Sequence, residues 1–211
     1  MKNSWGNQLY PYMAYTDIRS EIPRTFFHIL GGLFLAWIGY FLEPPGNKIL
    51  LGVIFCAALA TEAARLFIPR VNVFAKVLIG PFMRPYEDQG LTGAPAFTGG
   101  VFLAFLLFKP AVAMSALVPL IFGDRAGLLV GKSMGRISLK GKTLEGSLAC
   151  LAVTFLVYGI LKYTWTAVFG YGWIVLFAAS LVGTLAEMLP RPFDDNLTIP
   201  LAVGLFLTVV T

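Results

Sequence analysis

The segment AVAMSALVPLIFGDRAGLLV, residues 111–130, is 20 residues long and carries only two charged residues, Asp124 and Arg125. A helix needs about 20 mainly apolar residues to cross the hydrocarbon core of a bilayer. The segment therefore predicts a membrane-spanning helix that contains an acidic side chain. Ionisable groups inside such helices are costly, roughly 2.5–3.5 kcal/mol each on insertion scales, and they often mark functional sites.

Six more apolar segments lie on either side of this one. They cover residues 26–42, 49–67, 96–108, 148–161, 173–189 and 199–210. Three of them, 96–108, 148–161 and 199–210, are short for a membrane-spanning helix. Residues 71–81 form another apolar stretch, interrupted by Lys76, that we expect to be interfacial or re-entrant. The chain is thus predicted to be an all-α, polytopic membrane protein with about seven transmembrane helices. We expect one membrane-embedded domain over residues 1–211, in which residues 1–23 form a polar cytoplasmic or interfacial segment.

The composition of the 211 residues supports this class. Hydrophobic residues make up 57% and charged residues 13% of the chain, against about 45–50% and about 25% in soluble domains. These values exclude an ordinary soluble globule, a disordered chain, a coiled coil and a disulfide scaffold. The apolar segments also lack the period-2 alternation of membrane β-barrel strands.

Basic residues are unevenly distributed between the loops. If the N-terminus lies in the cytoplasm, 13 Lys and Arg residues fall on the inner side and three, Lys48, Lys109 and Lys162, on the outer side. Cytoplasmic loops carry such an excess, so we expect an integral, multi-pass membrane protein, which in a bacterium or archaeon would lie in the cytoplasmic membrane. Nearly all polar groups capable of chemistry also fall on the inner side, where we expect an active site. We attribute the net charge of +5 to the orientation of the chain in the membrane and to the binding of anionic ligands. No nucleic-acid partner is expected.

Carboxylates occur at two informative places. We interpret Asp124 as a metal ligand, because Arg125 should point about 100° away around the helix and is no obvious partner; the alternative is an Asp neutralised by a basic residue elsewhere. The second place lies between the last two apolar segments. Oxygen ligands of this kind suit Mg²⁺, which proteins hold by one or two carboxylates plus substrate phosphates, although helix capping can explain one of them. The residues there are Glu187, Asp194, Asp195 and Asn196.

Glycines recur every fourth residue after the first carboxylate, at Gly123, Gly127, Gly131 and Gly135. The stripe indicates either close packing of two helices or close approach of a nucleotide. It leads into a basic loop, residues 131–146, that can offer ammonium and backbone N–H groups to phosphates. Anionic lipid headgroups are the alternative ligands of this loop. Its basic residues are Lys132, Arg136, Lys140 and Lys142.

Two further pairs share a helical face. Glu62 and Arg65 stand at i and i+3 and can pair, either as a structural ion pair or to orient a phosphate. Arg24 and His28 stand at i and i+4 at the start of the first helix, where the histidine is either an amphipathic anchor or a functional group. Arg84, in a polar loop, is a weaker candidate for phosphate contact.

These residues form a series of motifs in a fixed order: Arg24-x-x-x-His28, Glu62-x-x-Arg65, Gly123-Asp124-x-Ala126 leading to Lys142-Thr143-x-Glu145-Gly146, and Asp195-Asn196-x-x-x-Pro200. Over residues 24–200 the chain resembles the CTP-dependent lipid-alcohol kinases, which include dolichol or polyprenol kinase, phytol kinase and yeast-type diacylglycerol kinase. The block 123–146 also resembles phosphatidate cytidylyltransferase, and this implies a shared CTP and metal region. Thr25 departs from the family, which often has Lys there.

The resemblance implies Mg²⁺-dependent transfer of the γ-phosphate of CTP to the hydroxyl of a membrane lipid alcohol, either an isoprenoid alcohol or diacylglycerol. A CTP:lipid-phosphate cytidylyltransferase, or a small transporter or lipid-binding protein, remain alternatives, and the oligomeric state is left open. The expected catalytic residues are Asp124, His28 and Asp195, and the expected metal ligands are Asp124, Asp195 and Glu187. The expected substrate- and nucleotide-binding residues are Arg24, Glu62, Arg65, Arg84, Gly123, Gly127, Gly131, Lys132, Lys142, Thr143, Glu145, Gly146 and Asn196.

Overall fold

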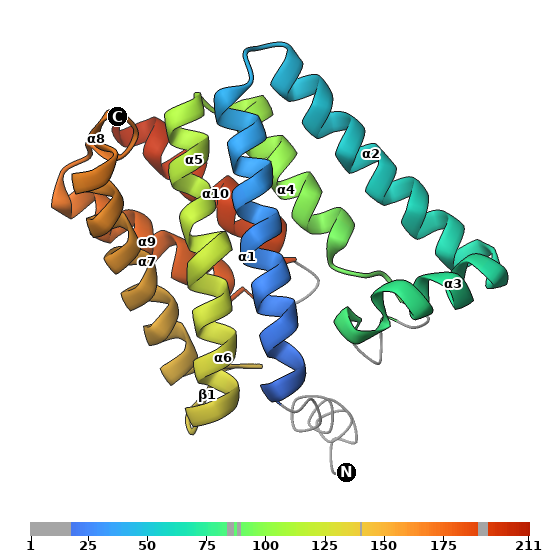
Figure 1. The fold of residues 1–211 in the computed structure, drawn as a ribbon. Helices are drawn as coiled ribbons and strands as arrows, with labels where there is room; N and C mark the ends of the chain where they lie inside the picture. Colours follow the sequence, from blue (N-terminus) through green and yellow to red (C-terminus); the bar gives the residue numbers. More distant parts are fainter. Residues whose placement is uncertain (1–17, 84–86, 88–89, 140, 190–193) are drawn as a thin grey trace, which may run out of the picture.

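The computed structural model describes the chain except residues 1–17, 84–86, 88–89, 140 and 190–193. Almost all regular structure in the described ranges is helical (Figure 1). The elements are α1 (Ile18–Phe41), α2 (Gly46–Phe67), α3 (Pro69–Ile79), the 3₁₀ turn η2 (Gly80–Phe82), α4 (Ala94–Leu107), α5 (Pro110–Val118), the π-helical turn η4 (Pro119–Gly123), α6 (Asp124–Met134), β1 (Ser138–Leu139), β2 (Lys142–Thr143), α7 (Leu144–Thr164), α8 (Thr166–Phe169), α9 (Trp173–Glu187) and α10 (Asp195–Val210).

Four helical segments are long and apolar enough to cross a membrane: Glu21–Phe41, Gly46–Phe67, Pro110–Met134 and Leu144–Thr164. The last is longer than the segment 148–161 expected from the sequence, because residues on both sides extend the helix. Three shorter apolar helices, α4, α9 and α10, accompany them. An integral, all-α membrane protein is thus supported, while seven crossings and a cytoplasmic N-terminus remain predictions. Residues 71–81 belong mainly to the 11-residue helix α3, in which no residue is buried.

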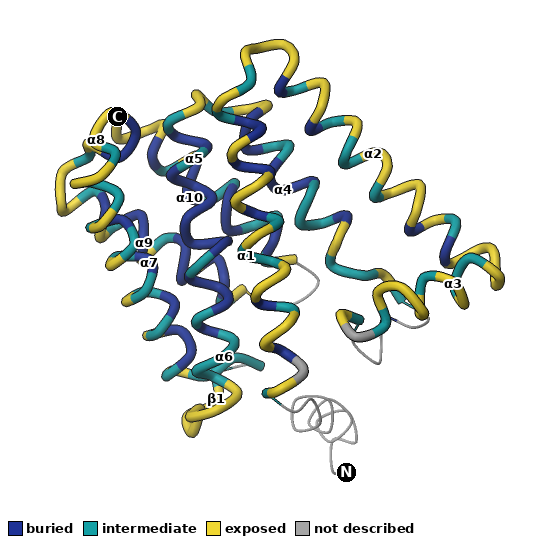
Figure 2. Tube along the Cα trace, viewed as in Figure 1, coloured by how far each residue is buried: buried dark blue, intermediate teal, exposed yellow. Residues whose placement is uncertain are grey.

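The segment Pro110–Met134 is the central helix of the bundle. It runs through α5, η4 and α6, and 72% of its most apolar window is buried, against 17% for α2. Helices α1, α4, α7, α9 and α10 all contact this central helix, while α2 packs on the outside against α1 and α4. Figure 2 shows the contrast, with α5 and α10 largely buried and α2 largely exposed. Asp124 therefore lies inside the protein even though its helix has the composition of a membrane span.

A proline shapes the centre of this helix. Pro119 has no N–H group to donate to the carbonyl of Ser115, four residues earlier. The hydroxyl of Tyr158 in α7 donates to that carbonyl oxygen instead, at 2.7 Å. Directly afterwards the N–H of Asp124 donates to the carbonyl of Pro119, which closes the π-helical turn. Such turns occur frequently at functional sites, and this one ends at Asp124.

Candidate active site

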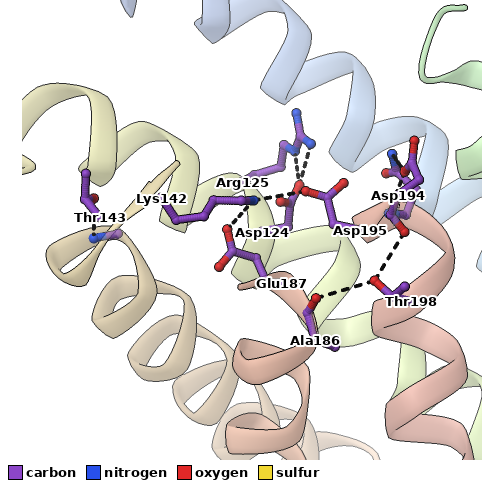
Figure 3. A network of polar contacts seen from close by, with 11 residues as sticks. Asp124, Arg125, Lys142, Thr143, Ala186, Glu187, Asp194, Asp195 and Thr198 are labelled. Atoms are coloured by element: carbon purple, nitrogen blue, oxygen red, sulfur yellow. Dashed lines mark hydrogen bonds and ion pairs between the residues drawn. The ribbon is translucent and has the colours of Figure 1, made fainter. Parts of the chain in front are cut away.

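The candidate site is formed by side chains from four separate elements (Figure 3). Asp124 begins α6, Lys142 lies on β2, Glu187 ends α9 and Asp195 begins α10. The Nζ atom of Lys142 is 2.5 Å from Oε1 of Glu187 and 3.1 Å from Oδ2 of Asp195. Asp124 lies near enough for its charge to act on all three of the others. We call Asp124, Glu187 and Asp195 the carboxylate cluster.

Asp124 has a partner that the sequence did not predict. Its carboxylate is 2% exposed, and Oδ2 accepts a hydrogen bond from Nε of Arg125 at 2.8 Å. Arg125 Nη2 pairs with the same oxygen. The expectation that the two residues would not pair is wrong. The arginine side chain is long enough to fold back to the adjacent residue, and a buried carboxylate without a counter-charge is strongly unfavourable.

Lys142 is the cation that joins the cluster across the bundle. Burial by itself would lower the pKa of Lys142, but the nearby charges of Asp195, Asp124 and Glu187 outweigh it. The pKa of Lys142 consequently lies well above its ordinary value. The ammonium group therefore remains charged at physiological pH, and all three of its N–H bonds can donate.

Two buried side-chain oxygens, one in the cluster and one in the residue after Asp195, have no hydrogen-bond partner among the described residues. They are Oε2 of Glu187, a residue only 4% exposed, and Oδ1 of Asn196. The side-chain amide of Asn196 donates to Oδ1 of Asp194 at 2.9 Å, as does its backbone N–H. Asp194 is thus the N-cap of α10, which confirms the capping alternative for this one residue.

These donors fit Mg²⁺ chemically. They are carboxylate and amide oxygens, and two of them are buried without a partner, which is a costly arrangement unless something else pairs with them. Within the described ranges no three His, Cys, Asp or Glu side chains form a complete metal-binding group. Lys142 and Arg125 instead hold oxygen atoms of the predicted ligands. A metal would therefore need further ligands, such as substrate phosphates, as is usual for Mg²⁺.

The basic loop folds into a hairpin that delivers Lys142. Strands β1 and β2 pair antiparallel, and Gly141 adopts a positive φ of 99° in the turn, a conformation that favours glycine. Thr143 then caps α7, because its hydroxyl accepts a hydrogen bond from the N–H of Gly146 at 3.1 Å. Glu145 accepts from the N–H of Ile137 at 3.3 Å. Three predicted nucleotide ligands thus have structural roles in holding the hairpin, whether or not they touch a nucleotide.

The glycine stripe packs helix against helix. A Cβ atom added to Gly123 would lie 2.2 Å from Oγ1 of Thr154 in α7. At Gly131 it would lie 2.8 Å from Oγ1 of Thr143, and at Gly127 3.1 Å from the carbonyl oxygen of Gly146. Helix α7 and its N-cap Thr143 therefore cover this face of α6, as the packing alternative expects. A nucleotide contact at these glycines stays a prediction.

A buried glutamate that the sequence analysis missed binds two of the predicted phosphate ligands. Glu21 is fully buried, and its Oε1 is 2.5 Å from Nζ of Lys132 and 3.1 Å from Nη1 of Arg24. Arg24 also donates to the carbonyl oxygens of Phe82, at 2.9 Å, and Met83. These contacts tie α1, α6 and η2 together. The spacing of Glu21 and Arg24 at i and i+3 is the signal that could have identified this residue.

His28 lies beside the π-helical turn. Its Nε2 atom is 3.1 Å from the carbonyl oxygen of Leu120, and its ring packs on that of Phe97 with centroids 4.3 Å apart. A carbonyl only accepts, so Nε2 of His28 carries a proton and donates this hydrogen bond. The imidazole is also close enough to Asp124 for electrostatic interaction. The structure thus brings these two predicted catalytic residues into one region.

Glu62 and Arg65 form the ion pair expected from their spacing. Nη2 of Arg65 is 2.6 Å from Oε1 of Glu62. Glu62 accepts from the N–H and the hydroxyl of Thr92, and Arg65 donates to the carbonyl oxygen of Glu87 at 2.9 Å. The pair therefore anchors the loop before α4. Arg84 and Lys140 lie outside the described residues.

The anchored loop leads to Asn196. A Cβ atom on Gly93 would lie 3.9 Å from the side-chain nitrogen of Asn196, and one on Gly100 only 2.0 Å from its carbonyl oxygen. Helix α4 thus meets the beginning of α10 at this residue. Glu62 and Arg65 consequently support the site from a distance rather than touching the carboxylate cluster in any contact described here.

Comparison with known proteins identifies three fungal relatives, each named CTP-dependent diacylglycerol kinase 1. The relative from Eremothecium gossypii is 28% identical over 214 residues, covering 91% of this chain and 68% of its own. The relative from Schizosaccharomyces pombe is 24% identical over 208 residues, which cover 91% of this chain and 94% of the relative. The relative from Saccharomyces cerevisiae is 27% identical over 218 residues, which cover 91% of this chain and 74% of the relative. No family model and no solved structure matches the chain. The resemblance to the CTP-dependent lipid kinases is thereby confirmed.

Proposed function

We propose that this protein is a membrane enzyme that transfers the γ-phosphate of CTP to the hydroxyl of a lipid alcohol. The names of the three relatives support CTP as donor and diacylglycerol as the first acceptor to test. The observation that carries the proposal within this chain is the meeting of Lys142 with the carboxylate cluster from four elements. Phosphoryl transfer depends mainly on positioning and charge neutralisation, and this arrangement supplies both.

Three residues would hold the metal of this reaction. Asp124, Asp195 and Glu187 are the proposed ligands of Mg²⁺, which when bound neutralises phosphate charge and orients the phosphate oxygens. The partnerless oxygens of Glu187 and Asn196 support this assignment. Arg125 holds the buried carboxylate of Asp124 in place.

Lys142 is the proposed phosphate ligand. It stands on a hairpin whose turn and cap fix its direction, and its side chain is 32% exposed, so the ammonium can be reached by a nucleotide. Lys132 is the weaker candidate, since its side chain is less exposed, at 24%, and its partner Glu21 does not belong to the carboxylate cluster. We assign the phosphate-binding role mainly to Lys142 on this ground.

His28 is the proposed general base. Its Nδ1 atom would accept the proton of the lipid hydroxyl while the hydroxyl oxygen forms a bond to the γ-phosphorus. The bond from the γ-phosphorus to the bridging oxygen breaks at the same time, and CDP leaves with that oxygen. The position of His28 beside Asp124 and the π-helical turn supports this role.

We also propose that the whole chain forms one catalytic domain, with seven membrane crossings and the site on the cytoplasmic side. The three short apolar helices would complete the four longer ones. The distribution of 13 against three basic residues supports the orientation. In this arrangement a lipid hydroxyl enters between helices from the bilayer, and CTP arrives from the cytoplasm.

The test uses the purified chain in mixed micelles with Mg²⁺ and CTP labelled at the α- or the γ-phosphorus. Diacylglycerol, phytol, farnesol, polyprenol and phosphatidic acid are offered one at a time. Label reaching an alcohol from the γ position is the expected result, and the accepting lipid names the substrate. Label from the α position reaching phosphatidic acid would make the protein a cytidylyltransferase. Transfer from neither position, by folded protein, would contradict both enzyme proposals.

A further inference from the structure

Lys142 holds the oxygen atoms that the proposed metal would need. Its ammonium contacts Oε1 of Glu187 at 2.5 Å and Oδ2 of Asp195 at 3.1 Å. We propose that Lys142 is an internal competitor of the divalent cation, so that metal binds firmly only when nucleotide phosphates draw the ammonium away. The inference rests on the proposed function and deepens it, since it assigns an order to the binding of metal and nucleotide.

The cluster has the character of a cation site and not only of an acidic patch. Oε2 of Glu187 is buried and has no hydrogen-bond partner among the described residues, although Oε1 of the same carboxylate is bound to Lys142. Leaving one oxygen of a buried carboxylate unpaired is unfavourable. A single ammonium group therefore does not satisfy the site completely, and a cation with several ligand positions would.

The charges decide which cation the site favours. Two cations, Lys142 and Arg125, contact the three carboxylates, so the group keeps one net negative charge. Moving Lys142 away would double that negative charge and release two oxygen atoms at once. A divalent ion is then attracted more strongly, because Coulomb energy scales with the charge and is large at a buried site.

The two cations differ in how freely they can move. Arg125 is only 9% exposed, and both of its hydrogen bonds to Asp124 are buried. The side chain of Lys142 is 32% exposed and extends from a two-residue strand. Lys142 is therefore the cation able to leave, and phosphate oxygens are the acceptors that can compensate its ammonium for the lost carboxylates.

The first test measures metal binding without nucleotide or lipid. Mn²⁺ is titrated into the purified full chain in detergent, and free Mn²⁺ is followed by electron paramagnetic resonance. Lys142→Met should bind Mn²⁺ about tenfold more tightly than the wild type, because it removes the competing charge. Lys132→Met is the matched control, since it removes an equal charge that is bound to Glu21 instead. Adding Glu187→Gln to Lys142→Met should abolish the gain.

A second test needs no substitution, in case the variant is poorly folded. The wild type is treated briefly with an acetylating reagent with and without saturating Mg²⁺, and each lysine is quantified by mass spectrometry. Mg²⁺ should raise the acetylation of Lys142 several-fold relative to Lys132.

Equal Mn²⁺ affinity in wild type and Lys142→Met, or an equal gain in Lys132→Met, would overturn the inference, as would an unchanged reactivity of Lys142. Neither test involves phosphate transfer. Failure of the kinase assay together with the expected Mn²⁺ result would therefore reject the proposed function alone.

Discussion

The hydroxyl of Tyr158 donates a 2.7 Å hydrogen bond to the carbonyl oxygen of Ser115, which Pro119 leaves without its helical donor. Both residues of this contact are buried, and it joins α7 to the central helix just before the π-helical turn. The turn leads directly into Asp124. A contact remote from the carboxylates thereby stabilises the backbone that positions one of them.

Tyr158→Phe should lower the free energy of unfolding by about 1–3 kcal/mol, because a buried carbonyl loses its only described donor from α7. Thermal unfolding in detergent measures the loss. Adding Pro119→Ala restores an N–H at position 119 and should recover part of the stability. If the double variant is no more stable than Tyr158→Phe alone, the hydroxyl of Tyr158 does not stabilise the protein by replacing the N–H group that Pro119 lacks.

Asp124→Asn should reduce γ-phosphate transfer at least about 100-fold, since it removes a charge proposed to hold the metal. The variant should still purify as a monodisperse membrane protein, which size-exclusion chromatography in detergent checks. If the variant transfers phosphate at the wild-type rate, the carboxylate of Asp124 is not needed for the reaction, and the proposed site is wrong at its central residue. Glu43→Gln, whose carboxylate stands in the turn between α1 and α2, is a matched control and should leave transfer unchanged.

Gly123→Ala should destabilise the protein, because the new Cβ would lie 2.2 Å from Oγ1 of Thr154. Thr154→Ala removes that oxygen, which has no described hydrogen-bond partner, and should be nearly neutral by itself. The double variant should regain both stability and transfer in part. A double variant that is stable yet inactive would instead support a nucleotide-binding role for Gly123.

Glu62→Gln should cost about 3 kcal/mol of stability, because it removes the negative charge that lies 2.6 Å from the buried guanidinium of Arg65. Unfolding in detergent is again the measurement, with Lys48→Met as control. Among the described residues, the ammonium group of Lys48 contacts the carbonyl oxygen of Leu106 at 3.5 Å. Its loss should change stability by no more than about 0.5 kcal/mol. A loss below 1 kcal/mol in Glu62→Gln would show that the loop before α4 is held by other contacts.

The proposed topology predicts opposite labelling of two loops. In a background with Cys56 and Cys150 replaced by Ala, Lys48→Cys should react with an impermeant maleimide added to intact cells. Arg136→Cys should react only after the membrane is opened. Labelling of Arg136→Cys in intact cells would show that the proposed orientation is wrong and that the site faces the outside.

The sequence by itself determined the class of the protein and its ion pair in α2. Apolar length is a property of a continuous segment, so segments such as 111–130 predict membrane helices without reference to the rest of the chain. Glu62 and Arg65 share a helical face whatever surrounds them, and they pair as their spacing predicts. The motif order likewise agreed with the family of the three relatives.

The tertiary structure alone decided which side chains meet. Lys142 reaches Glu187 and Asp195 across 45 and 53 residues of chain, through a hairpin and the ends of two helices. The glycine stripe, which the sequence allowed to serve either a helix or a nucleotide, faces α7. Local periodicity gives the face on which a residue lies, but not the element that covers that face. The partners of buried charges follow from packing, because each must find whichever counter-charge the assembled helices bring within reach.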